Sequence, residues 1–255
     1  MNLLTYSLHL LGSGANAYIL ARQLRDPLTR PNILAGFQLA ESGSVPFLET
    51  LRDRAANEGD TWLADKLTRH AADEKRHGLI FAHGLKRLNK RVIDFKQVSE
   101  TTTEGKPSER DRSPFFAAYF DGYSPESLKP QNIDWIVFLA STYILELDAS
   151  KDFARMAKVL PEDDPNSKHL KQGILSIAND ETRHAAYLYE ALQRRLSDNA
   201  AAAVVEEWRQ RKVNALIAMA SNLFQKGGKI PSIVQEGAPT DLPDVDVAQS
   251  QLVVA

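Results

Sequence analysis

Residues 73–77 read DEKRH and residues 180–184 read DETRH, so one five-residue pattern occurs twice in a chain of 255 residues. A single string of this kind is usually part of a solvated, charged helix face. Two copies at matching places in two long helical segments indicate an internal repeat. The fold class follows from the residues around this repeat.

A lone glutamate precedes each copy of the motif in an otherwise apolar stretch. Glu41 stands 33 residues before Glu74, and Glu146 stands 35 residues before Glu181. The complete pattern is therefore E…DExRH, and the chain carries it twice.

Apolar periodicity and the positions of proline and glycine predict five long helices, over residues 31–58, 61–90, 132–159, 167–196 and 199–226. The first four form two hairpins. We expect Asp60 or Thr61 to cap the second helix and Ser167 to cap the fourth.

The remaining segments connect or follow these helices. Residues 92–131 form a long crossover between the hairpins, with a short aromatic helix expected over 115–120. Residues 229–255 carry no basic residue after Lys229 and are expected to be an extended or mobile tail. No segment alternates at period two for long enough to demand a sheet. The sequence thus predicts an all-α fold, in which residues 1–228 form a four-helix bundle of two hairpins with a long crossover and additional helices.

The spacing places the glutamates of each hairpin at one height. The first turn lies about midway between Glu41 and Glu74, and the second lies about midway between Glu146 and Glu181. With a rise of about 1.5 Å per residue in both antiparallel helices, the paired side chains come level. Glu and His of each motif are three residues apart and share a helix face. Two stacked hairpins would therefore bring four carboxylates and two imidazoles to one level of the bundle.

All six side chains lie in apolar stripes that should form the core. Four buried carboxylates without compensating charge would be prohibitively costly, and two cations would remove that cost. Oxygen-rich ligation with two imidazoles suits iron or manganese better than zinc or copper. Di-iron carboxylate bundles use the same arrangement, with one Glu from each of two helices and Glu-x-x-His from the other two. The predicted metal ligands are Glu41, Glu74, His77, Glu146, Glu181 and His184.

The paired motif, Glu41 with residues 73–77 and Glu146 with residues 180–184, resembles that of the ferritin-like di-iron carboxylate superfamily. Acyl-carrier-protein desaturases and bacterial multicomponent monooxygenases carry this motif. The resemblance covers residues 31–196 as a pattern of helices. It implies a ferritin-like bundle with two iron ions, and it leaves a manganese–iron pair open.

The resemblance also implies a role for each motif residue. The ligands of one iron would be Glu41, Glu74 and His77, and those of the other would be Glu146, Glu181 and His184. Glu74 and Glu181 would bridge the two ions. Asp73 and Asp180 would accept the outer N–H of a ligating histidine, which fixes its tautomer and orientation, and Arg76 and Arg183 would support these aspartates.

Two residues that lie one turn from a glutamate are weaker candidates. His70 shares a face with Glu74 and could be an extra ligand or an outer base, although the sequence favours a core histidine with satisfied hydrogen bonds. Thr142 precedes Glu146 and could donate a hydrogen bond near bound oxygen, or simply pack between helices.

The expected function is that of a non-haem di-iron oxygenase or oxidase, which activates dioxygen to hydroxylate, desaturate or similarly oxidise a small, largely apolar substrate. An external electron donor is expected, because the sequence has no flavin, iron–sulfur or nicotinamide fingerprint. The alternative is a rubrerythrin-like or ferritin-like peroxidase or ferroxidase without an organic substrate, and a third reading makes the metals structural. The absence of cysteine excludes the thiolate-ligated iron module of rubrerythrins. The long crossover and the fifth helix favour the oxygenase.

Composition and hydropathy narrow the possible metal-binding groups, partners and location of the protein. Without cysteine, a metal must be bound by carboxylate, imidazole, amide or backbone groups. The formal net charge of −2 does not suggest nucleic acid as a partner. No apolar run approaches the roughly 20 residues that span a bilayer, and the N-terminus does not read as a targeting signal, so we expect a cytoplasmic protein without a membrane span. The sequence leaves a homo-oligomer open.

Overall fold

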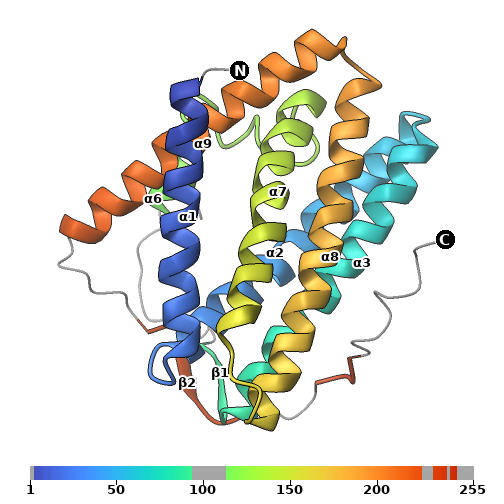
Figure 1. Ribbon diagram of the computed structural model, residues 1–255. Helices are drawn as coiled ribbons and strands as arrows, with labels where there is room; N and C mark the ends of the chain where they lie inside the picture. Colours follow the sequence, from blue (N-terminus) through green and yellow to red (C-terminus); the bar gives the residue numbers. More distant parts are fainter. Residues whose placement is uncertain (1–2, 94–112, 226–231, 240–241, 246–255) are drawn as a thin grey trace, which may run out of the picture.

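The computed structural model describes residues 3–93, 113–225, 232–239 and 242–245. Within these residues the chain forms seven helices and one pair of three-residue strands (Figure 1). The all-α class predicted from the sequence is confirmed.

Two long helical hairpins make up the body of the molecule. Helices α2 (Arg30–Asn57) and α3 (Thr61–Arg87) form the first, and helices α7 (Trp135–Val159) and α8 (Pro165–Gln193) form the second (Figure 1). Helix α3 packs against α8, so the two motif-bearing helices are neighbours. All four predicted helices are present, with ends shifted by a few residues.

The two hairpin turns are capped by aspartates. Asp60 accepts a hydrogen bond from the backbone N–H of Leu63 and caps α3, as predicted. The prediction that Ser167 caps α8 is wrong, because Asp164 occupies that position and accepts from the backbone N–H of Ser167. Pro165 supplies the reason: its fixed φ suits the first helical position, so the helix starts two residues earlier than the sequence pattern suggested.

Three further helices complete the described fold. Helix α1 (Leu3–Arg25) packs against α7 and α9, and helix α6 (Pro114–Tyr119) packs against α9 (Asp198–Gln225). Helices α6 and α9 match the predicted aromatic helix and the predicted fifth long helix. Helix α1 was not assigned from the sequence.

The two strands tie part of the C-terminal segment to the bundle. β1 (Lys90–Val92) pairs antiparallel with β2 (Val234–Glu236), with Lys90 opposite Glu236. Other parts of the predicted crossover and tail, over 94–112, 229–231, 240–241 and 246–255, lie outside the described residues.

The core consists of two apolar clusters at different heights in the bundle. One includes Leu48 and Leu67, and the other includes Leu34 and Phe81. Along α2, Glu41 lies between Leu34 and Leu48, and along α3 the residues 70–77 lie between Leu67 and Phe81. A layer of buried polar side chains therefore separates the two halves of the core.

Candidate metal centre

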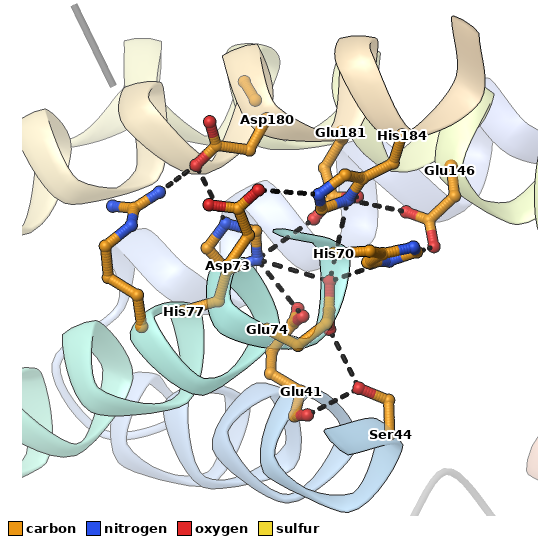
Figure 2. A network of polar contacts seen from close by, with 12 residues as sticks. Glu41, Ser44, His70, Asp73, Glu74, His77, Glu146, Asp180, Glu181 and His184 are labelled. Carbon is orange, nitrogen blue, oxygen red and sulfur yellow. Dashed lines mark hydrogen bonds and ion pairs between the residues drawn. The ribbon is translucent and has the colours of Figure 1, made fainter. Parts of the chain in front are cut away.

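The polar layer draws on all four helices of the two hairpins. Glu41 comes from α2, and Glu146 comes from α7. Helix α3 contributes His70, Glu74 and His77, and helix α8 contributes Glu181 and His184. Figure 2 shows these side chains converging from facing helices. The structure thus brings together all six ligands predicted from the sequence.

Two glycines let the helices approach closely around this layer. A Cβ atom on Gly78, next to His77, would lie 2.2 Å from Oγ of Ser42 on α2. A Cβ atom on Gly173 of α8 would lie 2.5 Å from Cγ2 of Ile80 on α3. Glycine at both positions therefore permits the close spacing of α3 with α2 and with α8.

Four side chains form the first group of donors: Glu41, Glu74, His77 and Glu181. One donor atom from each lies within 4.8 Å of the others, and all four residues are buried. Nδ1 of His77 lies 3.6 Å from Oε2 of Glu41, 3.6 Å from Oε1 of Glu74 and 3.3 Å from Oε1 of Glu181. Three carboxylates thus surround one imidazole nitrogen.

The second group of donors consists of His70, Glu74, Glu146 and His184, again within 4.8 Å of one another. Oε1 of Glu74 lies 3.3 Å from Nε2 of His70 and 3.7 Å from Nδ1 of His184. Glu146 approaches the same two nitrogens at 3.5 and 4.0 Å. Glu74 therefore belongs to both groups.

Glu181 also reaches towards both groups. Its Oε1 faces His77 in the first group, and its Oε2 lies 3.2 Å from Nδ1 of His184 in the second. Glu74 and Glu181, which the resemblance assigned as bridges, thus each contact histidines of both groups.

The weaker candidates differ in their positions. The ring of His70 stacks on that of His184, with centroids 3.7 Å apart, and its Nδ1 lies 2.7 Å from the hydroxyl of Tyr187. His70 is thus placed among the donor atoms, whereas the sequence favoured an ordinary core histidine. Thr142 is half-buried in α7, and its side chain makes no hydrogen bond within the described part of the chain.

Each motif aspartate contacts the histidine of the other motif. Oδ2 of Asp180 lies 3.1 Å from Nε2 of His77, and Oδ2 of Asp73 lies 3.1 Å from Nε2 of His184. Arg76 donates to Asp180, and Arg183 donates to both aspartates. Because Nε2 of each histidine is held in this way, Nδ1 is the nitrogen that faces the carboxylates.

The four carboxyl groups of the cluster form two neighbouring pairs, Glu41 with Glu74 and Glu181 with Glu146. In each pair the pKa of one group is raised and that of the other is lowered. Burial raises the pKa of Glu41 well above its usual value, and the Glu74 carboxylate adds to the effect. Burial likewise raises the pKa of Glu181, with a contribution from Glu146. Burial would also raise the pKa values of Glu74 and Glu146, but contacts with His70 and other partners outweigh it and lower them. Each pair thus holds one group that favours its proton and one that favours its charge.

The pKa values of the three histidines also shift in different directions. Burial opposes the charge of His77, but the carboxylates of Glu181 and Glu74 outweigh it and raise its pKa to about 9. The pKa of His70 is raised well above its usual value, since Tyr187 and nearby carboxylates outweigh burial. Burial and the neighbouring His70 lower the pKa of His184 to about 4. In the metal-free cluster, the neighbouring carboxylates therefore favour the charged imidazole of His77 and His70, but not of His184.

One unsatisfied atom is consistent with a cluster that could hold a metal ion. Nδ1 of His77 is one of two buried side-chain nitrogen or oxygen atoms in the described residues that lack a hydrogen-bond partner. Buried polar atoms are nearly always satisfied, so such an exception calls for an explanation. A cation among the three surrounding carboxylates would satisfy it. Carboxylates with imidazoles form a donor set that iron and manganese accept.

Sequence reasoning missed one residue that touches this cluster. Ser44 of α2 donates to the backbone carbonyl of Glu41 at 2.7 Å and to Oε2 of Glu74 at 3.1 Å. The available signal was its position, about one turn after Glu41 in the same helix.

No family model matches the chain, and neither a curated protein nor a solved structure matches it. Among the described residues, no helix is long and apolar enough to cross a membrane.

Proposed function

We propose that the protein is a di-iron carboxylate oxidoreductase of the ferritin-like kind, which activates dioxygen to oxidise a small, largely apolar substrate. The observation that carries the proposal is the pair of four-donor groups that share Glu74, in which every residue is buried except the half-buried Glu146. Two groups of this composition at one level of a helical bundle suit two iron ions, or one manganese and one iron.

The chain's own residues would hold the two ions in a fixed relation. The first group offers three carboxylates and one imidazole, and the second offers two carboxylates and two imidazoles. Asp180 and Asp73 keep the outer nitrogens of His77 and His184 occupied, so that Nδ1 of each ring stays turned inward. Glu74 and Glu181 lie between the groups and would connect the ions.

The surroundings of the cluster support oxidation chemistry. Apolar clusters lie on both sides of the polar layer and keep bulk water away from it. When bound, a pair of redox-active metal ions supplies the electrons and the Lewis acidity needed to reduce dioxygen. An external protein or small molecule would return the electrons, because the sequence carries no cysteine for an iron–sulfur centre.

Anaerobic loading with ferrous iron tests the proposal. We expect about two irons per chain by metal analysis, the number set by the two four-donor groups. Admission of oxygen should then change the absorbance, and replacing Glu74 or Glu181 by Ala should remove that change. The Glu190→Ala variant serves as a control, because this residue pairs with Arg194 on the exposed face of α8.

The outcomes separate the classes of function. A chain that binds no iron would overturn the metal centre. Uptake of many irons per chain would indicate storage, and rapid oxidation by peroxide but not by oxygen would indicate a peroxidase. Either result would overturn the oxygenase and leave the metal site standing.

A further inference from the structure

The two oxygens of the Glu74 carboxylate have different surroundings. Oε1 faces the imidazole nitrogens, at 3.3 Å from His70, 3.6 Å from His77 and 3.7 Å from His184. Oε2 points the other way, towards α2, where the hydroxyl of Ser44 donates to it at 3.1 Å (Figure 2). One oxygen thus belongs to both donor groups, and the other is held by a serine.

The Ser44 hydroxyl is shared between two acceptors. It also lies 2.7 Å from the backbone carbonyl of Glu41, a residue of the first group. A hydroxyl has a single hydrogen, so it donates fully to only one of these oxygens at a time. Ser44 therefore links the backbone at one donor of the first group to the side chain that both groups share.

Helix α2 carries a proline two residues after this serine. Pro46 lies inside the helix, and it has no N–H to donate to the carbonyl of Ser42. The helix continues through Pro46 without a break. The segment that carries Ser44 thus has one backbone hydrogen bond fewer than a regular helix.

We propose that Ser44 is a positioning residue, which holds Oε2 of Glu74 away from the ions so that Oε1 is the single oxygen Glu74 offers to both. The inference rests on the proposed metal centre and adds a residue to it. It also gives Glu74 a defined change of binding mode: release by Ser44 frees Oε2 to turn towards the ions, while the hydroxyl turns to the Glu41 carbonyl.

The test uses cobalt(II) as a spectroscopic probe in the full-length chain. Ser44→Thr and Ser44→Val form a matched pair, because the two side chains have the same shape and only threonine keeps the hydroxyl. Ser150→Ala is the control, since Ser150 makes the same bond to a carbonyl three residues earlier, that of Leu147 in α7. Calorimetry gives the number and affinity of bound ions, and absorption and electron paramagnetic resonance report the coupling between them.

We expect the valine variant to bind the second cobalt ion about tenfold more weakly, the loss that one hydrogen bond to a charged group represents. Its coupling signal should also change. The threonine variant and Ser150→Ala should both behave like the natural chain. Circular dichroism of the metal-free variants shows whether each one folds, and the threonine–valine comparison remains decisive if both are equally destabilised.

Two results would overturn the proposals separately. If the natural chain binds two cobalt ions and the valine variant keeps the same affinity and coupling signal, the role of Ser44 is wrong. If the natural chain binds no cobalt, the metal centre itself is wrong.

Discussion

The carboxylate of Asp180 in α8 lies 3.1 Å from Nε2 of His77 in α3, so the aspartate of one repeat orients the histidine of the other. Asp73 and His184 make the reciprocal contact at the same distance. Among the described residues, neither aspartate hydrogen-bonds to the histidine of its own motif. Correct orientation of both rings therefore depends on α3 and α8 being docked against each other.

This exchange predicts that Asp180→Asn weakens metal binding by about 10- to 100-fold, the usual effect of losing a carboxylate behind a ligating histidine. Asp73→Asn should weaken it less, because the Asp73 side chain is 20% exposed and that of Asp180 is fully buried. Cobalt titration by calorimetry measures both. Asp65→Asn is the control, because Asp65 forms an exposed pair with Arg69 on α3, the helix that carries Asp73. Natural affinity in Asp180→Asn would contradict the assigned role.

The sequence predicted which side chains come together because its signal is local and repeated. Glu74 and His77 are three residues apart, and helix geometry alone puts them on one face. What the sequence could not reveal is the exchange of partners between repeats. Whether Asp73 contacts His77 or His184 depends on how the two hairpins dock, and no spacing along the chain encodes that. The position of His70 within the second group depends on the same docking.

Helix α1 escaped prediction because its hydropathy pattern is inverted. Thr5 and His9 are buried, whereas Leu4 and Leu11 are 68% and 71% exposed. A periodicity argument assigns leucines to the core and therefore finds no core-facing stripe here. Both polar residues have partners inside: His9 bonds to the buried carboxylate of Asp148 on α7 at 2.7 Å, and Thr5 donates to the Gln210 side chain of α9 at 2.7 Å.

The protonation of the metal-free cluster predicts that metal affinity rises with pH. His77, with a pKa of about 9, must lose its proton to bind a cation, and so must His70, whose pKa is also raised. Burial raises the pKa of Glu41 and of Glu181, so these carboxyl groups must also lose their protons before they bind a cation. Protons compete with metal, so affinity should increase from pH 6 to about pH 9 and binding should release protons. Calorimetry in buffers of different ionisation enthalpy counts them, and a pH-independent affinity without proton release would contradict the prediction.

His70 predicts a difference between the two ion positions. His70 occurs only in the second group, so His70→Phe should weaken the binding of one of two cobalt ions and leave the affinity for the other unchanged. Tyr187→Phe removes the hydroxyl that holds Nδ1 of His70 and should have a smaller effect, about tenfold at the same position. Two ions bound with natural affinities in His70→Phe would show that the residue is an ordinary core histidine. Tyr143→Phe is the control, because the ring of Tyr143 packs against that of Tyr189 and, within the described part of the chain, makes no ring contact with the histidines of the cluster.

A second buried polar cluster predicts a large stability effect away from the metal. Oδ2 of Asp148 accepts from His9 at 2.7 Å, from Ser13 at 2.9 Å and from Lys212 at 2.6 Å, which joins α1 and α9 to α7. Asp148→Ala leaves the Lys212 charge buried and unpaired, so we expect a loss of about 3–5 kcal/mol in the free energy of unfolding. Urea denaturation measures the change.

The exposed pair of Glu190 and Arg194 supplies the comparison for that variant. Glu190→Ala should change the free energy of unfolding by less than about 1 kcal/mol, because solvent screens such pairs. If Asp148→Ala were no more destabilising than this variant, the buried cluster would not be what fastens α1 and α9 to the bundle.

Asp152 lies one turn further along α7, and we expect its substitution to stabilise the fold, whereas substitution of Asp148 should destabilise it. Burial, reinforced by the nearby charge of Asp148, raises the pKa of Asp152 to about 6, and its side chain is only 12% exposed. The unfolded chain releases this proton near pH 4, so folding takes up a proton between about pH 4 and pH 6. Stability is lost as pH rises through that window, and the penalty is fully present at neutral pH. Asp152→Asn should therefore raise the free energy of unfolding by up to about 3 kcal/mol at pH 7.5 and leave it nearly unchanged at pH 4. Urea denaturation at the two pH values measures the difference, and an equal effect at both would show that the ionisation of Asp152 is not the cause.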